Sequence, residues 1–114
     1  MSHELILRPE AEADLAEAFE WYEARASGLG FEFVRSVDSL FSSSCRNPLS
    51  YPIVYKTIRR ALTRKFPYEI FFVLETETVI ILAVFHAKRN PKRWRERIEI
   101  SSSNSLQRMA YSHR

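Results

Sequence analysis

The chain has 114 residues and a formal net charge of +3, and 46% of its residues are apolar. This length allows one domain with a buried core and excludes a second. The apolar runs are too short to span a bilayer, and the start lacks the charged and then apolar layout of a signal peptide, so we expect a cytoplasmic protein with no membrane partner.

Residues with metal or redox chemistry are few. The single Cys45 cannot form an internal disulfide, and we expect it to be buried near a helix end. The three histidines are scattered along the chain, which predicts neither a metal site nor a cofactor.

The charges are distributed unevenly. Residues 1–50 contain four basic and nine acidic residues, whereas residues 51–97 contain eleven basic and four acidic ones. The basic half is therefore predicted to contact a polyanion or an acidic protein segment. The alternative is that these charges are only solvated surface groups.

The N-terminal part predicts a short strand and a helix. Residues 4–8 form a β-type run, and Pro9 suits the first position of a helix, because its missing N–H would be unpaired there. Apolar residues then recur at three- and four-residue steps to about residue 26, which predicts an amphipathic helix. Its acidic residues are interpreted as a solvated face: Glu10, Asp14, Glu17 and Glu20.

A second helix is expected directly after the first. Gly28 and Gly30, the two glycines of the chain, stand where a tight turn between helices needs positive φ. Apolar residues again follow a helical spacing from about Leu29 to Ser44. The two helices should form an antiparallel hairpin.

The rest of the chain is rich in β-branched and aromatic residues. It predicts three strands, at 53–56 with 58–65, at 68–75 and at 78–86, and the short ETET connection makes the last two antiparallel. The last strand is apolar on both faces, so it should lie centrally beneath the helices, leaving the other side of the sheet open for charge.

These elements predict an α+β fold. An N-terminal strand and a two-helix antiparallel hairpin should pack on a mainly antiparallel sheet of about four strands, with strand 4–8 at or near an edge and Ile6 buried. Residues 1–100 should form a single domain. The polar stretch 101–114 is expected to be a poorly ordered tail.

Two stretches carry a resemblance to a known family: RPEAEADLAEAFEWYEARASGLGFEF near the start, and IRRALTRKFPYEIFFVLETETVIILAVFHAKRNPKRWRER further on. The most specific part is an ordered set, namely a basic residue before Phe66-Pro67-Tyr68 and then Ala83-Val84, His86, Lys88-Arg89, Pro91, Trp94 and Arg97. Over about residues 4 to 98 the chain resembles the toxins of type II toxin–antitoxin modules, the RelE/ParE superfamily.

The resemblance implies one of two activities. RelE-like toxins cleave mRNA on the ribosome with basic side chains and no metal, whereas ParE-like toxins bind DNA gyrase. Aligned on Tyr68, the RelE-like catalytic lysines fall at Arg60 and Leu62, and an important arginine falls at Glu69. A carboxylate there would repel the scissile phosphate, so the chain is placed nearer the ParE-like branch.

The expected function is therefore that of a ParE-like toxin of a plasmid stabilisation module. It would inhibit gyrase by binding, arrest growth, and be neutralised by a cognate antitoxin. The alternatives are a RelE-like, ribosome-dependent mRNA endonuclease and a non-toxic homologue that only binds its antitoxin. Whether the chain is an enzyme is left open.

Four cations are the candidates for target binding, and we expect them on one side of the domain: Arg60, Arg64, Lys88 and Arg89. Arg60 and Arg64 should share one strand face. If the chain is a ribonuclease, its catalytic residues would be Arg64, His86 and Arg89, with His86 as the base. The alternative for His86 is a hydrogen-bonded structural role at the end of a strand.

Three aromatic residues complete the candidates. Trp21 and Tyr22 are interpreted either as core residues or as antitoxin contacts. Trp94, together with Pro91, is expected to fix the C-terminal segment to the sheet.

Overall fold

The computed structural model describes residues 3–88 and 92–97. Strand β1 (Glu4–Leu7) precedes two helices, α1 (Pro9–Arg25) and α2 (Leu29–Arg46). A 3-10 turn at Pro48–Ser50 leads to β2 (Ile53–Tyr55), β3 (Ile58–Leu62), β4 (Tyr68–Glu75) and β5 (Thr78–His86), and residues 92–97 are helical. The predicted tail 101–114 and the contact expected of Pro91 lie outside the described residues.

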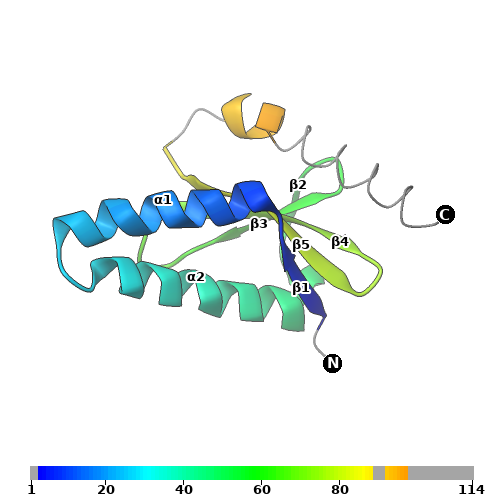
Figure 1. Ribbon diagram of the computed structural model, residues 1–114. Coiled ribbons are helices and arrows are strands. Elements are labelled where there is room, and N and C mark those ends of the chain that lie inside the picture. The colour runs from blue at the N-terminus through cyan, green and yellow to red at the C-terminus, as the bar shows by residue number, and fades with distance from the viewer. Residues whose placement is uncertain (1–2, 89–91, 98–114) are drawn as a thin grey trace.

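The strands form one sheet in the order β1-β5-β4-β3-β2, and the antiparallel helices cover one of its faces (Figure 1). β1 pairs with β5 in parallel, with Glu4 opposite Thr78, and every other pairing is antiparallel. The predicted α+β architecture is confirmed, with β1 at an edge and β5 in the interior of the sheet. Ile6 lies on that edge strand and is 46% exposed, so the expectation that it is buried was wrong.

The sheet has five strands, where about four were expected, because the stretch 53–65 folds back on itself. Lys56 adopts a positive φ of 52° in the turn that separates β2 from β3. β3 then ends at Leu62 and not at residue 65. Thr63 closes the next turn, since its N–H donates to the carbonyl of Tyr68 at 3.2 Å and its hydroxyl donates to the carbonyl of Phe66.

The turn between the helices depends on both glycines, for different reasons. Gly28 has φ +88°, as expected, whereas Gly30 is helical and lies against α1: a Cβ there would come within 2.7 Å of the Phe19 carbonyl oxygen. The positive φ expected for Gly30 was therefore wrong, and close packing explains this glycine. The Glu23 carboxylate accepts the N–H groups of Gly28 and Gly30 at 2.8 and 2.9 Å, which fixes the start of α2.

The core between helices and sheet is strongly aromatic. The Tyr22 ring lies 5.2 Å from Phe33 and 4.9 Å from Phe66, and Phe33 lies 4.9 Å from Tyr68. Cys45 is buried near the end of α2, as predicted, and burial raises the pKa of its thiol. These contacts join α1, α2 and β4 into one apolar layer.

The opposite face of the sheet is also covered. Trp94, which is 6% exposed, stacks on Phe71 with ring centroids 4.5 Å apart, and both belong to a second apolar cluster with Val73, Leu82 and Phe85. The predicted contact of Trp94 with the sheet is confirmed. The open, charged face expected on this side was wrong, because apolar residues of β4 and β5 face both ways.

β5 contains a bulge that matters for the site below. Phe71 pairs with Ala83 but Phe72 pairs with Ile81, so Leu82 is an extra residue in the ladder. Leu82 and Ala83 both join the second cluster, and Val84 returns to the helix-facing core.

Among the described residues, no helix combines the length and apolarity that a membrane span needs.

Candidate functional site

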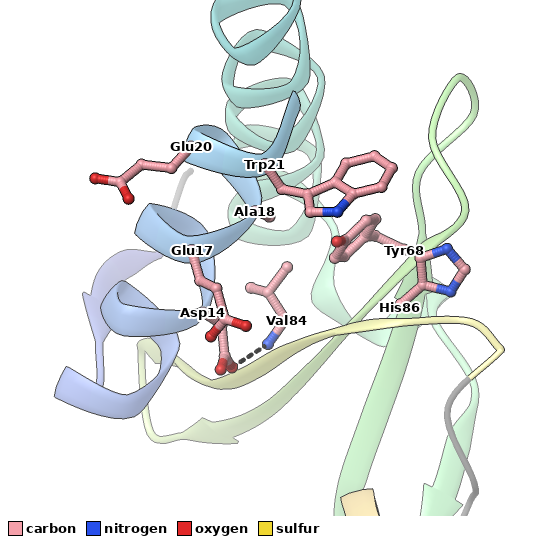
Figure 2. Close-up of a pocket in the computed structure, with 8 residues that line it drawn as sticks. All are labelled: Asp14, Glu17, Ala18, Glu20, Trp21, Tyr68, Val84 and His86. Carbon is pink, nitrogen blue, oxygen red and sulfur yellow. Dashed lines mark hydrogen bonds between the residues drawn. The ribbon is translucent and has the colours of Figure 1, made fainter. Parts of the chain in front are cut away.

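A groove of about 640 Å³ lies between α1 and the end of β5 (Figure 2). We call it the α1 groove, and its polar and aromatic lining consists of Asp14, Glu17, Glu20, Trp21, Tyr68 and His86. β1 ends at Leu7, opposite Ile81, so the last residues of β5 extend beyond the end of their neighbour β1. The groove therefore combines the end of an interior strand with acidic helix side chains.

His86 is held at the end of β5 by two neighbours. Its Nδ1 accepts the backbone N–H of Lys88 at 3.0 Å, and its ring meets Tyr68 edge-on, with centroids 5.2 Å apart. A nitrogen that accepts this bond carries no proton, so the neutral ring has its proton on Nε2. Nε2 can then donate a hydrogen bond but cannot accept the proton of a 2′-hydroxyl, which favours the structural interpretation of His86.

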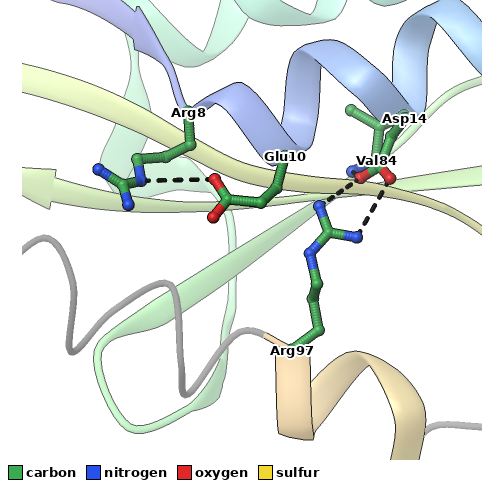
Figure 3. A network of polar contacts seen from close by, with 5 residues as sticks. All are labelled: Arg8, Glu10, Asp14, Val84 and Arg97. Atoms are coloured by element: carbon green, nitrogen blue, oxygen red, sulfur yellow. Dashed lines mark hydrogen bonds and ion pairs between the residues drawn. The ribbon is translucent and has the colours of Figure 1, made fainter.

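Asp14 was interpreted from the sequence as part of a solvated helix face. That interpretation was wrong, because Asp14 links three segments of the chain (Figure 3). Its Oδ2 accepts the backbone N–H of Val84 at 3.0 Å, directly after the bulge. Its two carboxylate oxygens also accept Nη1 and Nη2 of Arg97 at 3.1 and 2.9 Å. Close by, Arg8 is 4% exposed, and its Nε lies 3.9 Å from Oε1 of Glu10.

Sequence reasoning missed this network because Asp14 has the same helical spacing as its exposed acidic neighbours. The chain does carry one signal, which is Arg97 at the end of the family-like stretch. A bidentate pairing of this kind fixes both groups in a planar geometry. Asp14 thus holds α1, β5 and the helical residues 92–97 in one arrangement.

Arg60 is paired within the domain. Its Nη1 lies 3.3 Å from Oε1 of Glu69, whose side chain is 12% exposed. Burial raises the pKa of the Glu69 carboxyl, and the charge of Arg60 opposes that rise. Glu69 lies opposite Leu62 and Phe85 in the ladder, on the sheet face that bears Trp94. His86 lies on the other face, beside Tyr68, so Arg60 and His86 are on opposite sides of the sheet.

Arg64 is on a third surface. The prediction that Arg64 shares a strand face with Arg60 was wrong, because β3 ends at Leu62, before Arg64. Arg64 lines a second groove of about 800 Å³, which we call the α2 groove, between α2 on one side and Tyr51 with residues 62–65 on the other. Lys88 is exposed just after β5, and Arg89 lies outside the described residues. The described candidate cations therefore do not converge on one point.

The two aromatic residues of α1 have different environments. Tyr22 is buried in the core, whereas Trp21 is 50% exposed at the α1 groove, with the Arg25 guanidinium 3.5 Å from its ring. Tyr22 is thus a core residue, and Trp21 offers an accessible surface.

The described residues contain no group of three or more His, Cys, Asp or Glu side chains placed to hold a metal ion.

Comparison with known proteins identifies the family. The sequence profile of the family described as "ParE toxin of type II toxin-antitoxin system, parDE" matches residues 5–91, which is most of the chain. The chain belongs to the ParE toxin family. The expected place in the RelE/ParE superfamily, nearer the ParE-like branch, is thereby confirmed. No curated protein sequence matches this ParE-family chain.

Solved structures of toxin–antitoxin systems resemble this chain. One is described as the chromosomal ParDE TA system from P. aeruginosa; it is 15% identical, with a TM-score of 0.66 over 76% of this chain and 98% of that one. Another is the toxin–antitoxin complex RelBE2 from Mycobacterium tuberculosis, 18% identical, with a TM-score of 0.48 over 75% of this chain and 99% of that one. The ParDE structure supports the fold of this ParE-family chain over the 76% of its length that the match covers.

Proposed function

We propose that this ParE-family toxin acts in the cytoplasm by binding DNA gyrase, does not itself cleave RNA, and is neutralised by a cognate antitoxin protein. Family membership supports a toxin of a type II module. The structural neighbours are described as a ParDE system and a RelBE2 toxin–antitoxin complex, in keeping with a protein partner. On this proposal, inhibition of gyrase would arrest growth, and the toxin together with its antitoxin would form a plasmid stabilisation module.

The observation that carries the choice of binding over cleavage is the dispersal of the candidate catalytic groups. Metal-free cleavage of RNA needs a base and several cations around one phosphate, each within about 3 Å of the atom it serves. Arg60 is instead paired with Glu69 on one face of the sheet, while His86 lies on the other and has Nδ1 occupied. Arg64 faces the α2 groove. This arrangement supports recognition by separate charged surfaces.

A purified, tag-free toxin tests the proposal against both alternatives. We expect it to inhibit supercoiling by gyrase and to accumulate gyrase cleavage complexes, with no cutting of ribosome-bound mRNA. Cutting of that mRNA without any effect on gyrase would contradict the proposal in favour of the endonuclease. No effect in either assay, together with tight antitoxin binding, would identify a non-toxic homologue.

A pair of variants tests the candidate target-binding cations. Arg64→Ala/Arg89→Ala should abolish gyrase inhibition while leaving melting nearly unchanged, because Arg64 is exposed and a surface charge contributes within about 0.5 kcal/mol to stability. The control Arg25→Ala/Lys56→Ala removes the same charge elsewhere and should remain active. A folded Arg64→Ala/Arg89→Ala protein that inhibits gyrase at wild-type potency would show that these two residues are only solvated charges.

A further inference from the structure

The α2 groove has the composition of a recognition surface. We propose that it binds an acidic, extended segment of a partner protein and that this segment covers Arg64. Naming the partner as the antitoxin rests on the proposed function, whereas the binding of an acidic segment does not.

The first argument is the charge of the groove. Arg35, Arg46 and Arg64 line it and are exposed, and within the described part of the chain none of them pairs with a carboxylate. Glu32 is the one acidic side chain among the described lining residues, and its Oε1 already lies 4.0 Å from Nζ of Lys65. The remaining cations repel one another, and an anionic ligand between them relieves that repulsion.

The second argument is an unpaired strand edge. β2 pairs with Ile58 and Arg59, and the N–H of Arg60 reaches the carbonyl of Pro52 at 3.0 Å. Because alternate residues of a strand direct their main-chain groups to the same side, the N–H and C=O of Leu62 point to that edge as well. No strand in the described part of the chain lies beside them. An extended peptide can pair there by adding a strand.

This edge favours a peptide over a nucleic acid. A peptide backbone supplies donors and acceptors in the alternation that a strand edge presents, and a phosphodiester backbone supplies acceptors alone. Leu62 is also 55% exposed and lies opposite Glu69, on the sheet face away from α2, so the apolar side chains that alternate with the acidic ones would find a contact there.

The helix side of the groove fits the same ligand. Ser36, Ser39 and Ser43 line it at three- and four-residue steps, and the Ser43 and Tyr51 hydroxyls are 2.6 Å apart. These hydroxyls can donate to carboxylates. At 1.5 Å per residue, α2 from Glu32 to Arg46 runs along the groove for roughly 21 Å. An extended chain covers that distance with about six residues, of which about three would direct their side chains to α2.

Occupation of the groove has a consequence for the toxin. Arg64 belongs both to this lining and to the cations proposed for target binding. A bound acidic segment would neutralise and cover that side chain. The partner and the target would therefore compete, although the rest of the target surface stays uncovered.

A synthetic peptide tests the groove directly. The probe is a fluorescein-labelled ten-residue peptide that alternates Glu and Val, and fluorescence anisotropy measures its binding to the full chain at low salt. We expect it to bind at least about tenfold more tightly than the same peptide with Lys in place of Glu, and to weaken as salt is raised. Equal binding of the two peptides would overturn the proposal.

Matched variants locate the binding. Arg35→Glu/Arg46→Gln should weaken binding of the Glu peptide by about tenfold or more, because both side chains line the groove. Arg25→Gln/Lys56→Glu makes the same change in net charge outside the groove and should stay within about twofold of the wild type. Circular dichroism checks that both variants fold. An equal loss of peptide affinity in the two variants would contradict the proposal. So would a groove that binds a short DNA duplex through Arg35 and Arg46 but does not bind the Glu peptide.

The antitoxin encoded beside the toxin separates this inference from the proposed function. We expect the groove variant to inhibit gyrase normally but to need about tenfold more antitoxin for neutralisation than the control variant. Normal neutralisation of the groove variant would refute the inference and leave the proposed function standing. Peptide binding by a chain that has no effect on gyrase would refute the proposed function and leave the groove assignment standing.

Discussion

Asp14 on α1 and Arg97 near the end of the described chain are 83 residues apart in sequence and share two hydrogen bonds, of 3.1 and 2.9 Å. The same carboxylate accepts the N–H of Val84 at 3.0 Å. That N–H follows the bulge and lies beyond the end of β1, so within the described residues no strand accepts it. Asp14 thus replaces a missing strand partner and anchors the segment that carries Trp94.

Removal of this carboxylate should destabilise the fold. Asp14→Ala leaves a buried N–H and a partly buried guanidinium without their acceptor, which costs about 2–3 kcal/mol and lowers the melting temperature by roughly 10 °C. Glu17→Ala, on the same helix but exposed, is the control and should shift melting by little. Thermal unfolding by circular dichroism measures both, and equal melting temperatures would contradict the role given to Asp14.

The two tryptophans should differ strongly on truncation. Trp94→Ala removes a 6% exposed ring from its stack on Phe71 and should cost about 3–5 kcal/mol. Trp21 is 50% exposed, so Trp21→Ala should cost less than about 1 kcal/mol. Urea unfolding compares them. If the two variants lose the same stability, the helical residues 92–97 do not cover the sheet in solution.

The Arg60 to Glu69 pair predicts a pH-dependent effect. Burial raises the pKa of Glu69 in the folded state. Ionisation of this carboxyl therefore lowers the stability of the folded protein as pH rises from the ordinary glutamate pKa through the raised value, and Arg60 reduces that loss. Arg60→Gln should therefore raise the pKa of Glu69 further. It should destabilise the protein by about 1–2 kcal/mol at neutral pH.

Acidification should remove most of that cost, because a protonated carboxyl needs no cation. Urea unfolding at pH 7 and at about pH 4, near the ordinary glutamate pKa, gives the comparison. The control Arg60→Gln/Glu69→Gln carries no charge at either position. Its stability should therefore change less between the two pH values than that of Arg60→Gln. An Arg60→Gln deficit that is equal at both pH values would show that the pair is not electrostatic.

The glycines of the helical turn should also respond differently. Gly30→Ala places a methyl group within 2.7 Å of the Phe19 carbonyl oxygen and should cost about 1–3 kcal/mol through displacement of α1. Gly28→Ala meets no atom within 4 Å but retains a positive φ, and should cost about 1 kcal/mol. Gly28→Asn, which tolerates that φ, should recover part of the loss. Chemical denaturation measures all three, and a harmless Gly30→Ala would refute the close packing of the helices.

Local pattern predicted most of the fold. Pro9, the helical spacing after it and the apolar stretch of β5 each report a local preference or a burial requirement, and these survive in the structure. The second covered face was missed because Trp94 acts through a contact with Phe71 that is distant in sequence. The division of residues 53–65 into two strands depends on a positive φ at Lys56, for which a lysine gives no signal.

The candidate site was harder to predict because residue type does not report direction. Arg60 and Arg64 look equivalent in the sequence, but a strand that ends at Leu62 sends them to different surfaces. Asp14 looks like Glu17, and only the bulge in β5, with the end of β1 nearby, creates the N–H that it accepts. Charge and motif order indicated the family, whereas the placement of each cation needed the three-dimensional structure.

The position of β5 has a consequence for synthesis of the protein. Among the described residues, β5 is the last strand to be translated, yet it lies between β1 and β4, and it is the one strand with which β1 pairs. Long-range pairings of this kind form late. A nascent chain interrupted before residue 78 therefore keeps the apolar β4 without one neighbour and β1 without any, and is exposed to aggregation and proteolysis. The proposed binding of gyrase would therefore require translation through β5, which joins β1 to β4.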